Sequence, residues 1–265
     1  MVELAVLERL CAGNCTKGSN PFLSAIFMNT LDQLKKDLRQ YINPEKAVFL
    51  PRFFKTGPGQ YAEGDKFLGV TVPNQRLVAK KYKDLPLNQV EKLIGSPWHE
   101  ERLTGLFILV GIYQKGDEKV KKEVYDFYIS HTKNINNWDL VDTSAGYIVG
   151  QYLENRPEKM KVLRQLAKSD LLWERRIAMI ATLAYIVKGS SEEALEIAEV
   201  LLNDKHDLIQ KAVGWMLREV GKRCSRQVLV EFLNKHYKTM PRTSLRYAIE
   251  HFSPELRKKY LTGKV

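Results

Sequence analysis

Cysteine is scarce in this chain of 265 residues, which contains only Cys11, Cys15 and Cys224. An odd number of cysteines, with no second pair to match Cys11 and Cys15, indicates neither a disulfide framework nor a zinc site. We therefore expect free thiols in a reducing compartment, and a cytoplasmic protein.

Long apolar runs are also missing. The longest stretches, around residues 106–113 and 179–187, fall well short of the roughly 20 residues that a membrane-spanning helix needs. Residues 1–10 include Glu3 and Glu8, and no small-residue cleavage site follows a long apolar stretch, so the sequence predicts no secretory signal. We expect no membrane partner.

Acidic residues are too few to balance the basic ones: 31 Asp and Glu stand against 42 Lys and Arg, which gives a formal net charge of +11. A charge of this size favours a polyanionic partner such as DNA, RNA or an anionic membrane surface. A basic surface that serves only solubility is the alternative.

A β pattern is absent, because no run of β-branched residues alternates with period two. After Pro73, helix-start signals follow one another, with Pro, Ser or Asp at the first turn, as at Asp117, Ser225 and Pro254. Gly, Asn and Pro interrupt residues 1–28, so we expect a loosely ordered N-terminal arm before one helical domain over residues 29–265. The loop at residues 55–64 contains Gly57-Pro58-Gly59, but it lacks the preceding strand and the Gly-Lys-Ser/Thr ending of a phosphate loop.

The predicted helices come in pairs, and their first members recur at intervals of roughly 33–40 residues. These first members begin near Pro97, Asn137, Asp170, His206 and Pro241. The interval is typical of HEAT-like or armadillo-like repeats, which stack into a curved solenoid with one concave face. We expect an all-α solenoid of this kind with a basic concave face; an irregular helical bundle is the alternative.

The helix after His206 has two opposite faces when its residues are placed ~100° apart. The apolar face, which should meet the core, carries Ile209, Ala212, Val213, Met216 and Val220. The other face is basic and carries Lys211, Trp215, Arg218 and Lys222. A tryptophan among cations can stack on a base while the cations contact phosphates. Burial of this tryptophan by the neighbouring repeat is the alternative.

The helix that begins near residue 137 brings Trp138 and Asp142 to one face, because they are four positions apart. Asp139 lies in the first turn, where the helix dipole stabilises a carboxylate, so this residue needs no functional explanation. Asp142 has no such explanation. In a protein this basic, it either performs chemistry or pairs with an arginine, and the sequence leaves both open.

The helix after Asp170 contains two adjacent arginines. Arg175 points away from the apolar stripe of this helix, and Arg176 lies at the edge of the stripe. A helical wheel does not decide which of the two meets a ligand.

Four motifs, in this order, resemble those of the AlkD-type DNA glycosylases, the HEAT-like repeat family of DNA alkylation repair enzymes. Residues 67–73 resemble its Phe-Leu-Gly-(Val/Ile)-x-x-Pro signature, and residues 137–142 resemble its Trp-Asp-x-Val-Asp motif. Residues 173–178 are similar to its Trp-x-x-Arg-x-Ala element, and residues 211–219 to its Lys-Ala-(Ile/Val)-Gly-Trp-x-Leu-Arg-Glu helix. The likeness covers about residues 30–260.

The resemblance implies that Asp142 is the catalytic carboxylate, that Trp138 and Trp215 flank the lesion nucleotide, and that Arg176 holds the DNA backbone. Family members remove positively charged N3- and N7-alkylated purines without drawing the base into a pocket, unlike most glycosylases. We expect further DNA contacts from Lys211, Arg218, Lys222 and Tyr61. The expected partner is double-stranded DNA with alkylated bases, bound by a monomer.

The residues themselves suit this chemistry. An alkylated purine already carries positive charge and is a good leaving group, so little acid catalysis is needed. Bond breakage puts positive charge on the sugar, which a carboxylate stabilises and indole faces attract. We therefore expect a monofunctional N-glycosylase with no metal, no cofactor and no lyase lysine. A catalytically silent DNA-binding relative is one alternative, and a protein-binding solenoid is another.

Overall fold

The computed structural model describes the backbone of residues 21–265 and the side chains of residues 30–265. In chain order the elements are α2 (Pro21–Arg39), α3 (Pro44–Phe49), the 3-10 helix η1 (Leu50–Phe53), α4 (Val72–Lys81), α5 (Leu87–Ile94), α6 (His99–Lys115), α7 (Glu118–Ser130), α8 (Trp138–Asp142), the π-helix η2 (Gly146–Gly150), α9 (Gln151–Leu153), α10 (Lys159–Ala167), α11 (Leu172–Ala181), α12 (Leu183–Ile186), α13 (Glu192–Leu201), α14 (Asp207–Arg223), α15 (Arg226–His236), α16 (Arg242–Ala248) and α17 (Pro254–Thr262). Residues 21–265 contain no strand, only an isolated bridge between Lys66 and Trp98. The expected all-α class is confirmed.

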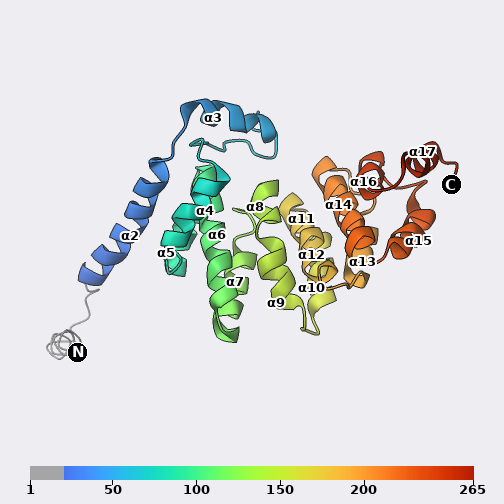
Figure 1. The fold of residues 1–265 in the computed structure, drawn as a ribbon. Coiled ribbons are helices and arrows are strands. Elements are labelled where there is room, and N and C mark those ends of the chain that lie inside the picture. Colours follow the sequence, from blue (N-terminus) through green and yellow to red (C-terminus); the bar gives the residue numbers. More distant parts are fainter. Residues whose placement is uncertain (1–20) are drawn as a thin grey trace.

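The helices from α4 to α17 stack in a row, with α2 at one end and α3 along its upper edge (Figure 1). The expected first members of the pairs are α6, α8, α11, α14 and α16; η2 and α9 continue the run of α8, and α12 continues that of α11. The second members are then α7, α10, α13, α15 and α17. Successive first members pack side by side, α8 against α11, α11 against α14, and α14 against α16. The chain is therefore the helical-repeat solenoid that the spacing predicts.

Polar side chains begin several of these helices where the sequence predicts a start. Asp117 accepts a hydrogen bond from the backbone N–H of Val120, and Ser225 accepts one from that of Val228. These oxygens satisfy N–H groups that have no partner inside the helix. The start of α2 differs from the expectation, because this helix begins at Pro21 and residues 21–28 belong to it. Residues 1–20 of the predicted N-terminal arm lie outside the described residues.

The core of α14 matches the predicted apolar stripe. All five stripe residues are fully buried: Ile209, Ala212, Val213, Met216 and Val220. Gly214 brings α14 close to α16, since a Cβ at this position would lie 2.5 Å from both the Ser244 carbonyl oxygen and the Tyr247 Cβ. This close approach places the other face of α14 beside α16.

The segment 66–70 ties α3 to the solenoid. The buried Glu100 carboxylate accepts hydrogen bonds from the backbone N–H groups of Leu68, Gly69 and Val70, at 2.9, 2.8 and 3.3 Å. Gly69 has φ +79°, and a Cβ there would lie 2.1 Å from the carbonyl oxygen of Asn43. Glycine is therefore required in this motif for a backbone reason. Within the described range, no helix is both long and apolar enough to span a membrane.

Candidate functional site

A cleft of about 430 Å³ lies where η1 and the following loop meet the first members of four helix pairs. It is lined by Arg52, Phe53, Lys55, Tyr61, Trp138, Asp142, Arg176, Asp207, Leu208, Lys211, Trp215, Arg218 and Tyr247. The solenoid thus brings together the predicted catalytic carboxylate, both predicted indoles and three of the predicted basic residues. Lys222 is exposed and lies outside this lining, beside Arg218 in a neighbouring pocket.

Asp142 pairs with Arg176 in a bidentate arrangement. Arg176 Nε donates to Asp142 Oδ1 and an Arg176 terminal nitrogen donates to Oδ2, both at 2.8 Å. The second terminal nitrogen donates to the Leu208 carbonyl oxygen, so α11 connects α8 to the start of α14. Asp142 therefore pairs with an arginine, as one of the two predicted alternatives has it. The same carboxylate also lines the cleft, as a catalytic role would require.

The pair is largely removed from water, but the carboxylate is less so than the guanidinium. The side chain of Asp142 is 15% exposed and that of Arg176 is 5% exposed. Burial raises the pKa of Asp142 above its usual value, and the Arg176 guanidinium offsets only part of this rise. A cation that donates to both oxygens favours the ionised form and fixes its orientation.

Arg176 itself has three internal acceptors, the two oxygens of Asp142 and one carbonyl. This geometry favours a role in holding Asp142, and contact with the DNA backbone stays a prediction. Arg175 turns elsewhere: it donates to Asp204 at 2.7 Å and to the carbonyl oxygen of Ser169 at 2.9 Å. Of these two arginines, Arg176 is the one that lines the cleft, and its contact with a ligand stays a prediction.

The two tryptophans occupy different parts of the cleft wall. Trp138 begins α8 and stacks on Phe54, with ring centroids 5.4 Å apart and an interplanar angle of 23°. Trp215 lies in the middle of α14 and is half-buried. Tyr61 also lines the cleft and meets the buried Trp173 edge-to-face at 5.6 Å. Aromatic faces at three points of one cleft suit a ligand with a planar or cationic group.

The basic residues of the cleft are partly neutralised by acids. Lys211 pairs with Asp207 at 3.1 Å, and Lys55 lies 4.0 Å from the same carboxylate. Arg218 pairs with Glu250 of the neighbouring helix pair. An anionic ligand would thus meet cations that already have partners, and binding would exchange one set of contacts for another.

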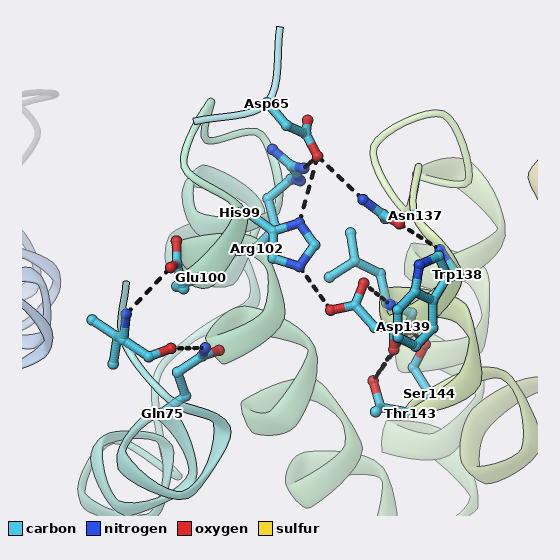
Figure 2. Close-up of polar contacts among 12 residues, drawn as sticks. Asp65, Gln75, His99, Glu100, Arg102, Asn137, Trp138, Asp139, Thr143 and Ser144 are labelled. Carbon is cyan, nitrogen blue, oxygen red and sulfur yellow. Dashed lines mark hydrogen bonds and ion pairs between the residues drawn. The ribbon is translucent and has the colours of Figure 1, made fainter. Parts of the chain in front are cut away.

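A buried polar network, which sequence reasoning missed, links α8 to the neighbouring α6 (Figure 2). His99 Nε2 lies 2.7 Å from Asp139 Oδ2, and His99 Nδ1 lies 3.5 Å from Asp65 Oδ2. Arg102 pairs with the same oxygen of Asp65 at 2.7 Å. Asp139, assigned only to the helix dipole, therefore anchors α8 to α6. The His99 ring also stacks on Phe67, with centroids 5.0 Å apart.

The charge of this network follows from its geometry. Burial alone would lower the pKa of His99, but Asp139 and Asp65 outweigh burial and raise it to about 9. His99 and Arg102 together lower the pKa of Asp65 despite its burial. His99 is consequently charged at neutral pH, and it lies with Arg102 against the side chains of Asp65 and Asp139. In the part of the chain that the structure describes, no three His, Cys, Asp or Glu side chains form a metal-binding group.

Fold and site together define an all-helical repeat protein with an oriented carboxylate and two indoles in one cleft. A family model described as DNA alkylation repair enzyme matches residues 34–252. The chain belongs to this family, which confirms the resemblance of the motifs. A solved structure titled "Predicted DNA alkylation repair enzyme from Enterococcus faecalis" has a similar fold, with a TM-score of 0.62 and 16% identity over 80% of this chain and 97% of that chain. No curated protein sequence matches this chain.

Proposed function

We propose that this protein is a monofunctional DNA N-glycosylase that excises positively charged N3- and N7-alkylated purines from duplex DNA. The observation that carries the proposal is the Asp142 carboxylate, oriented by Arg176 in a cleft shared with Trp138 and Trp215. Membership in the DNA alkylation repair family supports the substrate class.

The proposed reaction needs few groups. The glycosidic C–N bond breaks, its electron pair neutralises the charged base, and positive charge develops on the deoxyribose. The carboxylate of Asp142 stabilises that charge, and the indole faces of Trp138 and Trp215 attract it. Water then attacks the sugar carbon and loses a proton, which leaves a free base and an abasic site. An uncharged base would need protonation, for which this cleft offers no dedicated acid.

A catalytically silent DNA-binding protein is the second candidate, and one observation favours it. A bidentate Asp142–Arg176 pair is also what a purely structural role would produce. In that case the carboxylate would stabilise the stacking of α8 on α11, and its loss would reduce stability and DNA binding together.

Single-turnover release of N7-methylguanine from duplex DNA tests the proposal, measured beside a melting curve. For Asp142→Asn we expect a rate reduced about a hundredfold or more, since removal of one electrostatic stabiliser costs on the order of 2.7–4 kcal/mol. Asp204→Asn is a matched control, because Asp204 pairs with Arg175 in the neighbouring repeat outside the cleft. Normal excision by a folded Asp142→Asn protein would end the proposed mechanism. A large loss of stability with normal excision per folded molecule would favour the structural role.

A further inference from the structure

The α3–η1 segment (residues 44–53) has no buried side chain. Twelve large hydrophobic residues are exposed in the described part of the chain, and five of them lie in or next to this segment: Tyr41, Ile42, Val48, Phe49 and Phe53. Figure 1 shows α3 along the upper edge of the molecule, apart from the stacked helices. Apolar side chains gathered on one exposed element mark an interaction surface.

This surface is continuous with the candidate site. Arg52, Phe53 and Lys55 line the same cleft as Asp142, although Phe53 is 58% exposed. Phe49 meets Phe53 edge-to-face at 5.3 Å, so the two rings extend the cleft wall outward. A ligand that fills the cleft and continues past its rim would therefore contact both rings.

The charge of the segment indicates an anionic partner. The segment's one acidic residue, Glu45, lies at its start, and from Lys46 to Ala62 every charged residue is basic: Lys46, Arg52 and Lys55. The Arg52 guanidinium lies 5.7 Å from the centre of the Phe49 ring, so a cation and an aromatic face are presented together. Nucleic acid offers both complements, since phosphates attract the cations and bases stack on the rings.

The segment is also held firmly from behind. Phe54, the neighbour of Phe53, is buried and stacks on Phe67 and Trp138, at 5.3 and 5.4 Å. Phe53 thus points outward, and Phe54, which follows it, points into the protein. An outward ring on an anchored element can enter a base stack without loss of its own support.

We propose that Phe53 is an apolar wedge that enters the DNA at the base step next to the lesion. Phe49 would contact the adjoining sugar surface, and Arg52 and Lys55 would contact the flanking phosphates. Inserted apolar side chains partly unstack a base step and bend the duplex. Such bending would press the lesion nucleotide toward Asp142 and the two indoles while it remains in the helix. The inference rests on the proposed function, because it takes duplex DNA as the ligand of the cleft.

Base unstacking tests the wedge without any use of excision. The probe is a duplex with 2-aminopurine next to N7-methylguanine, and the fluorescence of 2-aminopurine rises when its neighbouring bases unstack. The fluorescence is read on binding, before any base is released, because an abasic site would also unstack the probe. We expect wild-type protein to raise the fluorescence and Phe53→Ala to abolish the rise. Affinity for the duplex should fall about 5- to 150-fold, which corresponds to the 1–3 kcal/mol of one stacked base.

Val48→Ala is the matched control, because Val48 is 73% exposed on the same segment but does not line the cleft. This variant should bind and unstack the probe as wild-type protein does, and melting curves of both variants should match wild type. Unchanged binding and fluorescence for Phe53→Ala would overturn the wedge. Equal losses for both variants would also overturn it, in favour of a general apolar surface. If wild-type protein unstacks the probe but releases no base, the proposed function fails and the wedge stands.

Discussion

Buried His99 should make the stability of this protein depend on pH in a defined window. Its imidazolium lies between Asp139 and Asp65, and Arg102 pairs with the same oxygen of Asp65. The pKa of His99 is raised to about 9 in the folded protein, against about 6.5 in an unfolded chain. The charged form therefore stabilises the fold fully below about pH 6.5, and this contribution is lost as pH rises through about 9.

The size of the effect follows from the same two values. A difference between about 9 and about 6.5 corresponds to about 3 kcal/mol in the free energy of unfolding. His99→Gln removes the cation and leaves two buried carboxylates with Arg102 as their remaining cation. At pH 6 we expect this variant to be less stable than wild type by about 3–5 kcal/mol, the usual cost of breaking a buried ion pair. Above pH 9 the difference should shrink by about 3 kcal/mol.

Urea unfolding of wild type and His99→Gln at intervals between pH 6 and 10 measures this difference. Other groups that titrate in this window are common to both proteins, so their effects cancel when the two curves are subtracted. His131→Gln is the control, because His131 also stacks on a phenylalanine and contacts a glutamate, but at the surface. A difference between wild type and His99→Gln that stays constant from pH 6 to 10 would refute a charged His99.

Three further outcomes are expected. Arg176→Ala should lower the free energy of unfolding by about 3–5 kcal/mol in urea titrations, because it leaves a buried carboxylate without its partner; unchanged stability with weaker DNA binding would instead support a phosphate contact. Gly214→Ala should cost about 1–3 kcal/mol through its clash with α16, whereas Gly111→Ala, with nothing within 4 Å, should stabilise α6 by up to about 1 kcal/mol. Lys222→Ala should reduce the slope of log affinity against log salt by about 1, while Lys122→Ala on α7 should leave the slope unchanged.

The fold was predictable from local signals because each helix carries its own start. Caps such as Asp117 and Ser225, and prolines such as Pro254, begin helices at the predicted positions. The interval between first members then predicts the repeat, since stacked pairs need a similar length of chain each. The prediction that α2 begins at residue 29 was wrong. The Gly, Asn and Pro residues before that position suggested a loop, but Pro21 is compatible with the first turn of a helix.

The candidate site was predictable only within single helices. Spacing of four residues joined Trp138 to Asp142, and a helical wheel placed Trp215 on the face of α14 that lines the cleft. The contacts that orient these groups cross between repeats, over 34 positions from Asp142 to Arg176 and 40 positions from His99 to Asp139. No periodicity within a helix contains that information. The available signal in the sequence was a histidine before two glutamates at 100 and 101. Its role as a buried anchor depends on which helix stacks against it.

The alternatives for Asp142, catalysis or an arginine pair, need not exclude each other. A carboxylate that works beside DNA is surrounded by phosphates and by apolar rings, and both conditions favour its protonated, inactive form. Arg176 opposes both effects because it donates to the two oxygens at once. The side of Asp142 that remains exposed lines the cleft, where positive charge would develop on a bound sugar. Arg176 thus limits the rise in the pKa of Asp142 and orients its carboxylate. Arg176→Ala should therefore slow base release most at low pH, where an unsupported carboxylate is protonated.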